Sequence, residues 1–274
     1  MQKIPILGAP LQALIAAIIG IVGVSAQAKP KDGFYYAESA KFDENGWKSQ
    51  VVLEVKGGKI VSANWNGVGN QAQEDKKTFA AAGKYGVIKL SKIKKEWHEQ
   101  AAAVEKYLLD TQDVNFSKLK PDGTTDAITG ASIHVKEFFD LAKAAFAAGP
   151  VEKGTYKKDG WFFAQSGKFD SNGYATTALI TIVNGRIVNA NWNAAYKQPG
   201  DSKYIKSVKG QYMKGTKGGE WHIQAAKVEA ALVKLQDLAK LAVKKDGTTD
   251  AVSGVSITVN EFVEIANVAL NKAK

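Results

Sequence analysis

Two copies of one hydroxyl-rich phrase are the residues of this chain best suited to chemistry. Residues 122–133 read Asp-Gly-Thr-Thr-Asp-Ala-Ile-Thr-Gly-Ala-Ser-Ile, and a near-identical copy follows 124 residues later at 246–257. Each copy precedes an amphipathic stretch that predicts a helix. Glycine and hydroxyl side chains at a helix start suit the binding of a phosphate group. The repetition therefore predicts two equivalent phosphate sites, with hydroxyls at Ser132 and Ser256.

The same serines also have a purely structural interpretation. A serine just before a helix is a common N-cap, whose oxygen accepts a hydrogen bond from an unpaired backbone N–H. Gly130 and Gly254 would then serve only the turn. Asp122 and Asp246, with the aspartates four residues after them, are expected to shape the loop rather than to act as acid–base pairs.

The duplication covers nearly the whole chain. Residues 42–47 match 169–174 and residues 58–66 match 185–193 at an offset of 127, whereas residues 96–98 match 220–222 at an offset of 124. The second copy therefore lacks three residues, net, between Asn193 and Glu220. A period this long indicates two tandem domains. We assign them to residues 29–149 and 150–274, because glycine and proline at 149–150 end the preceding helical pattern.

Each domain has the pattern of an α+β fold. Aromatic and β-branched runs separated by Gly57-Gly58 and by Asn184-Gly185 predict an antiparallel meander of three strands. Apolar residues at helical spacing follow the strands and predict helices packed on the sheet. The expected strands are 34–42, 50–55 and 59–65, then 161–169, 177–183 and 186–192; the expected helical faces are 97–108 and 135–146, then 221–235 and 259–270.

Residues 1–28 have the features of a secretory signal peptide. A basic start is followed by a short apolar run and by Ala26-Gln27-Ala28, which is an A-x-A cleavage site. We expect cleavage near Ala28 and a secreted or periplasmic protein; the alternative is an uncleaved anchor. The chain contains no cysteine, which excludes lipid attachment through cysteine, disulfides and thiolate metal sites.

The net charge of +10 does not indicate nucleic-acid binding. Residues 29–149 carry 18 basic and 16 acidic side chains, and residues 150–274 carry 18 and 11, so the excess lies in the second domain. A basic face suits an anionic surface polymer or an acidic redox partner. No nucleic-acid-binding motif accompanies it, and a solvated lysine surface is the simplest interpretation.

The phrase Asp-Ala-Ile-Thr-Gly-Ala-Ser resembles the attachment motif of the FMN-binding domain family. In that family, Asp, two variable residues, Ser or Thr, Gly and Ala precede a Thr or Ser, and this last hydroxyl receives FMN through a phosphoester bond. The resemblance implies covalently flavinylated, exported electron-transfer proteins, matured by a magnesium-dependent flavin transferase. The matching cofactor-binding positions are Asp126, Thr129, Gly130, Ala131 and Ser132 in the first domain, and Asp250, Ser253, Gly254, Val255 and Ser256 in the second.

The two copies depart from the family pattern in two ways. Both acceptors are serine, where the family more often has threonine. Val255 stands where alanine is usual, and its bulk beside Ser256 would hinder the transferase. Ser132 is therefore the stronger acceptor, and FMN held without a covalent bond remains the alternative at both positions.

A flavin also needs contacts to its ring. Trp65 and Trp192 lie at matched strand ends and are candidates to stack on it. Trp97 and Trp221 begin the apolar helical stripes and are expected in the core. The histidines that follow them, His98 and His222, are either hydrogen-bonded structural residues or contacts to the flavin. With three histidines and no cysteine, we expect no metal site.

The sequence thus predicts an exported flavoprotein with FMN on Ser132 and Ser256 that relays electrons between a membrane oxidoreductase and extracytoplasmic acceptors. Because no separate substrate pocket is marked, we expect a carrier rather than a self-sufficient enzyme. Two alternatives remain: a flavin-dependent reductase of a small acceptor, and a flavin-free module whose basic surface holds an anionic polymer.

Overall fold

The computed structural model describes residues 30–215 and 218–274, which form two similar α+β units. We call residues 29–149 unit 1 and residues 150–274 unit 2. The predicted cleavage site near Ala28 lies outside the described residues. Among those residues, no helix combines the length and apolar composition needed to cross a bilayer.

Each unit contains one antiparallel sheet of three strands in sequence order, as predicted. The central strand pairs with both neighbours, and the register shifts once in its pairing with the third strand, at Glu54/Val55 and at Thr181/Ile182. The strands are β1 (Gly33–Glu38), β2 (Trp47–Lys56) and β3 (Lys59–Gly69) in unit 1, and β4 (Gly160–Gln165), β5 (Tyr174–Val183) and β6 (Arg186–Tyr196) in unit 2.

The predicted hairpin turns are confirmed by their backbone angles. Gly57 and Gly58 have φ of 60° and 72°, and Asn184 and Gly185 have φ of 53° and 70°. Positive φ at both central residues defines the turn whose twist matches that of antiparallel strands, and only glycine and asparagine adopt it readily. In unit 1 the Asp32 carboxylate accepts a hydrogen bond from Gly58 N at 3.0 Å, which adds to the stability of the turn.

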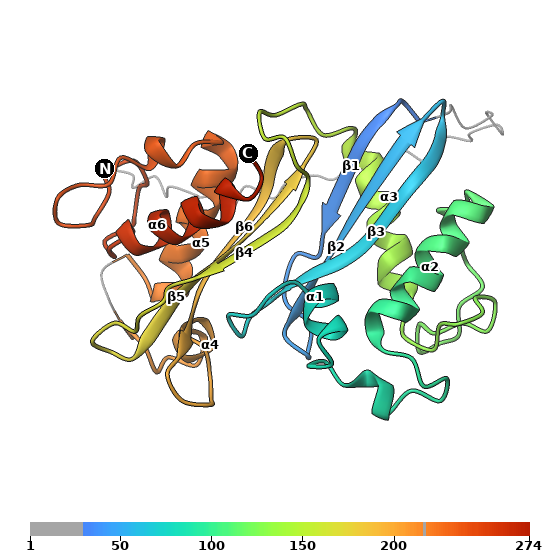
Figure 1. The fold of residues 1–274 in the computed structure, drawn as a ribbon, viewed down its shortest axis with the longest axis horizontal. Coiled ribbons are helices and arrows are strands. Elements are labelled where there is room, and N and C mark those ends of the chain that lie inside the picture. The colour runs from blue at the N-terminus through green and yellow to red at the C-terminus, as the bar shows by residue number, and fades with distance from the viewer. Residues whose placement is uncertain (1–29, 216–217) are drawn as a thin grey trace, which may run out of the picture.

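Two long helices cover one face of each sheet (Figure 1). In unit 1 the third helix contacts β1 and β2, and the second contacts β3. The short helices were not predicted, because six residues are too few to show a helical period. The helices are α1 (Lys76–Ala81), α2 (Trp97–Thr111) and α3 (Lys136–Ala148), then α4 (Lys203–Val208), α5 (Trp221–Leu235) and α6 (Asn260–Asn271), with 3₁₀ turns η1 (Val87–Lys89) and η2 (Leu238–Leu241).

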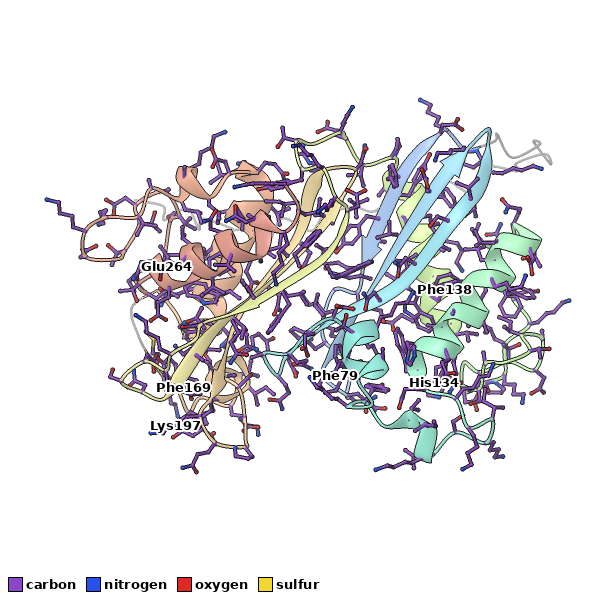
Figure 2. All side chains as sticks on the ribbon, in the orientation of Figure 1. Phe79, His134, Phe138, Phe169, Lys197 and Glu264 are labelled. Atoms are coloured by element: carbon purple, nitrogen blue, oxygen red, sulfur yellow. The ribbon has the colours of Figure 1, made fainter. Side chains whose placement is uncertain are left out.

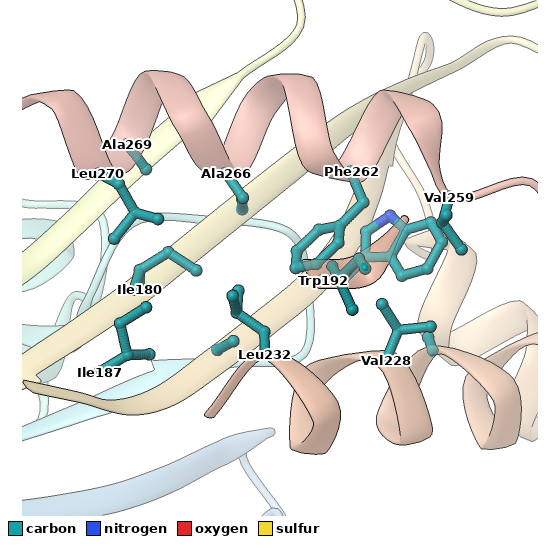
Figure 3. Packing of buried hydrophobic residues seen from close by; sticks show 14 of the residues in the cluster. Ile180, Ile187, Trp192, Val228, Leu232, Val259, Phe262, Ala266, Ala269 and Leu270 are labelled. Atoms are coloured by element: carbon teal, nitrogen blue, oxygen red, sulfur yellow. The ribbon is translucent and has the colours of Figure 1, made fainter. Parts of the chain in front are cut away.

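Each unit has its own apolar core between sheet and helices. In unit 2 the α6 residues Phe262, Ala266 and Leu270 face the strands, and Leu232 of α5 completes the layer against Ile187 (Figure 3). All of them are at most 2% exposed. The spacing of four residues along α6 places its apolar side chains on one face, which is why this stretch forms a helix here.

The other faces of the two sheets lie against each other (Figure 1). Gln50 of β2 accepts hydrogen bonds on Oε1 from Trp161 Nε1 at 2.5 Å and from Thr181 Oγ1 at 3.1 Å. Glu38 accepts from Asn189 Nδ2 at 2.8 Å. All ten residues of β5 are buried, as expected for a strand covered on both faces.

We predict that Gln50→Leu destabilises the protein by about 1–3 kcal/mol, because the Trp161 and Thr181 donors lose their acceptor at a buried interface. Urea unfolding followed by circular dichroism measures the free energy. Gln165→Leu, on an exposed position of β4, is the matched control. A Gln50→Leu protein within about 0.5 kcal/mol of wild type, the range of ordinary surface substitutions, would contradict the importance of this network.

Candidate functional site

Aspartate and threonine side chains shape the loop that carries the repeated phrase. In unit 1, Asp122 Oδ1 accepts from Thr124 N at 2.9 Å and from Thr124 Oγ1 at 2.7 Å, and these bonds lower the pKa of Asp122. Thr125, which is buried, donates its hydroxyl to the Lys118 carbonyl at 2.5 Å. Unit 2 repeats both arrangements at positions 246–249. The first aspartate of each phrase therefore shapes the loop, as expected.

Ser132 is held by a buried glutamine of α2. Gln100 Oε1 accepts from Ser132 N at 2.8 Å and from Ser132 Oγ at 3.0 Å. Ser91 Oγ lies 3.2 Å from Ser132 Oγ and accepts from Gln100 Nε2 at 3.2 Å. The Gln100 side chain is fully buried, whereas Ser132 is exposed. The loop thus presents an oriented hydroxyl at the surface.

The interpretation of the serines as N-caps is wrong. The N-caps of α3 and α6 are Val135 and Val259, and neither makes a side-chain capping bond. Ser132 and Ser256 precede the first helical residues by four positions, so neither hydroxyl reaches the helix start. The helix starts therefore lie four residues beyond the serine hydroxyls, and phosphate binding stays a prediction for the loop that carries the serines.

Unit 2 repeats the glutamine clamp. Gln224 Oε1 accepts from Ser256 N at 2.7 Å, from Ser256 Oγ at 3.2 Å and from Ile257 N at 3.2 Å. Gln224 Nε2 donates to the Gly219 carbonyl at 2.7 Å. The serine geometry is therefore shared by both copies.

The other motif residues surround the serines. Gly130 and Gly254 have φ of 90° and 71°, which favours glycine at both positions. Asp126 and Asp250 pair with lysines of the same loops at 2.5 and 3.0 Å. Thr129 and Ser253 are exposed, and Ala131 and Val255 are half-buried beside the unit cores.

A cavity of about 1460 Å³ in unit 1 includes Ser132 in its wall. Its lining comes from the loop after β1, from the segment between α1 and α2, and from the loop of the repeated phrase. Hydroxyl, imidazole and ammonium groups contribute, among them those of Ser91, His134 and Lys136. His134 lies at the lower end of unit 1 in the view of Figure 2. Sequence reasoning missed it, because unit 2 has Thr258 at the matching position.

Lys76 is the other site residue that sequence reasoning missed. Its side chain is 5% exposed, lines the cavity, and has Nζ 4.4 Å from the ring centre of Trp97 and 5.1 Å from that of Tyr85. Burial lowers the pKa of Lys76 to about 8 and raises the pKa of Tyr85 to about 12. The equivalent lysine of unit 2, Lys203, forms an ion pair with Asp170 at 3.5 Å. Within the described residues, Lys76 forms no ion pair with a carboxylate. The signal was available in the repeat: both lysines occupy matched positions 127 apart.

The tryptophans predicted to stack on a flavin belong to the cores. Trp65 is 2% exposed and packs on Trp97 and Phe138 at ring-centre distances of 5.3 and 5.4 Å. Trp192 is stacked on Phe262 at 4.8 Å. This burial corrects the expectation of open faces at Trp65 and Trp192, although Trp65 also borders the cavity. Trp97 and Trp221 are in the core, as predicted.

The two matched histidines differ. His222 Nδ1 lies 2.9 Å from Ser207 Oγ, which also accepts from His222 N at 3.0 Å, so this histidine is hydrogen-bonded within unit 2. His98 Nδ1 is buried without a hydrogen-bond partner in the described structure. Neither histidine is part of the cavity lining around Ser132.

The cavity found in unit 2 is smaller, about 390 Å³, and Ser256 is not part of its lining. It lies between residues 244–247 and the start of α6. The two units therefore share the serine clamp, and the cavity described in unit 2 lies away from its serine.

A carboxylate beneath each buried tryptophan also distinguishes the units. Glu105 accepts from Trp65 N at 2.6 Å and pairs with Lys77 at 2.6 Å. Glu229 accepts from Trp192 N at 2.6 Å, but unit 2 has Tyr204 where unit 1 has Lys77. Burial raises the pKa of Glu229 to about 7.

Comparison with known proteins finds two partial matches. No family model and no curated protein matches the chain. A solution NMR structure of a protein from Clostridium thermocellum is 49% identical over 43% of this chain and 91% of its own, with a TM-score of 0.35. A crystal structure of a protein from Clostridium perfringens is 26% identical over 44% of this chain and 88% of its own, with a TM-score of 0.33. Both are structural-genomics targets.

We predict that Glu229→Gln changes the pH dependence of stability. The native carboxyl, with its pKa raised from 4.5 to about 7, binds its proton more tightly than the unfolded one. Wild-type stability therefore falls as pH rises through this window, by up to about 3 kcal/mol, and levels off above it. Glutamine keeps the Trp192 hydrogen bond but cannot ionise.

Urea unfolding at pH 4 and pH 8 measures this effect. We expect the stability of Glu229→Gln relative to wild type to increase between the two pH values. Glu264→Gln, on an exposed position of α6, controls for loss of one acid and should show no such increase. A constant difference between wild type and Glu229→Gln at both pH values would refute the assignment.

Proposed function

We propose that the chain is an exported flavoprotein that carries FMN in phosphoester linkage on Ser132, and on Ser256 in the second unit, and relays electrons. The observation that carries the proposal is the oriented, exposed hydroxyl of Ser132 in the wall of a cavity of about 1460 Å³. Small-molecule sites typically measure roughly 300–1,000 Å³, so a mononucleotide fits this space.

The cavity is lined by basic side chains, which suit a phosphate, and by apolar side chains, which suit a flat ring. The ammonium groups of Lys92, Lys120 and Lys136 line the same cavity, where Lys120 and Lys136 pair with Asp126 and Asp140. Such groups bind phosphate through charge-assisted hydrogen bonds. Apolar side chains, including those of Ile133 and Leu141, supply contacts for a heterocycle. These residues would hold the phosphate and the ring, respectively.

The protein groups would orient the cofactor and tune its charge. Bound FMN supplies the redox chemistry, through its isoalloxazine ring. Gln100 would keep the Ser132 oxygen directed at the cavity, and positive charge around the cavity, including that of Lys76, would favour an anionic reduced form. The electron donor would be a membrane oxidoreductase and the acceptor an extracytoplasmic molecule; maturation would require a flavin transferase.

The second unit is the weaker candidate. Its serine has the same glutamine clamp, but Ser256 does not line the cavity of unit 2, and Val255 adds bulk beside the hydroxyl. We therefore assign the first FMN to Ser132.

A second candidate function is reduction of a small acceptor by the same flavin. The volume of the cavity favours it, because about 1460 Å³ exceeds the space that a typical single ligand needs. Saturable turnover of one small organic acceptor by the flavin-loaded protein would identify a reductase; equal, unsaturable rates with several acceptors would identify a carrier.

We predict that intact-mass analysis of protein expressed in its native host shows FMN phosphoester adducts, and that Ser132→Ala removes the first of them. Ser132→Thr should retain it, because threonine offers the same nucleophilic oxygen. Ser91→Ala is the matched control, since Ser91 contacts the Ser132 hydroxyl but lies outside the motif. Colourless wild-type protein without added mass, from cells that contain an active flavin transferase, would refute flavinylation and favour a flavin-free module.

A further inference from the structure

The segment between α1 and α2 carries an exposed apolar and basic surface. Residues 86–95 read Gly-Val-Ile-Lys-Leu-Ser-Lys-Ile-Lys-Lys, with no acidic side chain. We call them the 86–95 loop. Leu90 is 85% exposed, the highest value for a large hydrophobic side chain among the described residues, and Ile88 and Ile93 are 41% and 39% exposed. Figure 1 shows the segment at the lower edge of unit 1.

Hydrogen bonds hold the loop in the conformation that exposes these side chains. The Glu96 carboxylate joins the two ends of the loop by accepting from Gly86 N at 3.0 Å and from Val87 N at 3.1 Å. Inside the loop, Ser91 N donates to the Val87 carbonyl at 2.8 Å. Ser91 is buried and anchors the loop to Gln100. The loop therefore holds Leu90 outward.

The charges of the loop are uncompensated. Its four lysines are all exposed, and none of them makes an ion pair in residues 30–215 and 218–274: Lys89, Lys92, Lys94 and Lys95. By contrast, the Lys106 and Lys120 side chains of the same unit pair with aspartates at 2.8 and 2.5 Å. The loop thus presents four free positive charges around three apolar side chains.

The matching segment of unit 2 differs in sequence from the 86–95 loop. Tyr85 matches Tyr212, since each ring borders the buried lysine of its unit, and Glu96 matches Glu220. The segment between them is residues 86–95 in unit 1 and residues 213–219 in unit 2, so the three-residue difference between the copies falls here. Segment 213–219 contains no leucine, isoleucine or valine. At this place in the repeat, therefore, only unit 1 carries branched apolar side chains.

We propose that the 86–95 loop docks unit 1 on an anionic lipid bilayer. Leu90, Ile88 and Ile93 enter the boundary between headgroups and acyl chains, and the lysines remain among the headgroup phosphates. An acidic protein surface would satisfy the lysines but would leave Leu90 without an apolar environment, so charge and apolarity together favour lipid. Val87, Leu90 and Ile93 also line the cavity, which would then open beside the bilayer. This proposal is independent of flavin.

The test uses the chain purified from its host, with identical N-termini in all variants. Co-sedimentation with vesicles of phosphatidylglycerol and phosphatidylcholine measures the affinity, and pure phosphatidylcholine vesicles are the neutral comparison. Leu90→Ser should weaken binding to the anionic vesicles about ten- to a hundredfold, the equivalent of one buried leucine side chain. Val268→Ser, at a 50% exposed position of α6, should not.

The charge requirement is tested by replacing the four loop lysines with glutamine, which should abolish binding. The matched control replaces four exposed lysines of unit 2, Lys157, Lys158, Lys240 and Lys245, and should retain it. Because the chain has no cysteine, Leu90→Cys and Val268→Cys each carry a single environment-sensitive fluorophore. Only the label at position 90 should shift to the blue with anionic vesicles.

Three results would overturn the proposal. The first is no binding to anionic vesicles. The second is equal loss of binding in the two lysine sets, which would indicate non-specific charge attraction. The third is unchanged affinity in Leu90→Ser with no fluorescence shift at position 90, which would point to an acidic protein partner instead of lipid.

Discussion

A three-stranded sheet has two faces to bury, and the helices of each unit cover only one. The rest of the structure depends on how the second face is covered. The two units solve the problem by covering each other, with Gln50, Trp161 and Thr181 hydrogen-bonded across the boundary and Glu38 bonded to Asn189. The contact is polar, so its geometry is set by donors and acceptors as well as by burial.

The candidate site lies in loops that are attached to the sheet and helices of each unit. The fixed point of each site is a buried glutamine from the first turn of α2 or α5, whose amide oxygen binds both the backbone and the hydroxyl of one serine. A buried amide oxygen that accepts two bonds orients the serine without taking it into the core. The clamp is common to both units, whereas the cavity beside Ser132 and the 86–95 loop distinguish unit 1. Duplication has thus kept the hydrogen-bond geometry between the serine and the glutamine, whereas the 86–95 loop is particular to unit 1.

Much of the fold could be predicted because its signals are local. The hairpin turns require positive φ, which glycine and asparagine adopt readily, so these residues mark the turns in the sequence. The regular spacing of apolar residues marks the helices α2, α3, α5 and α6. The short helices α1 and α4 were missed because one and a half turns show no period. The polar sheet interface was also not predicted, because the strand pattern around Gln50 and Glu38 does not show that a second sheet covers them.

The site residues that lie in the repeated motif could be predicted from the sequence. The residues that tertiary contacts bring to the site could not. Ser132 and Ser256 were found from the repeat, but their role as N-caps was wrong, because two more residues separate each serine from the N-cap valine. The stacking role of Trp192 failed since Phe262, 70 residues later, covers its face. Lys76 and His134 enter the site only through folding: the repeat matches Lys76 with Lys203 but does not show that either lysine is buried, and no sequence pattern marks His134.

The proposed function requires a flavin phosphate bonded to Ser132. The most direct measurement is tandem mass spectrometry of the proteolytic peptide that contains residues 122–135, taken from protein made in its native host. We expect fragment ions that locate FMN on the Ser132 oxygen. An unmodified peptide at full recovery, from cells whose transferase flavinylates other proteins, would contradict the proposal.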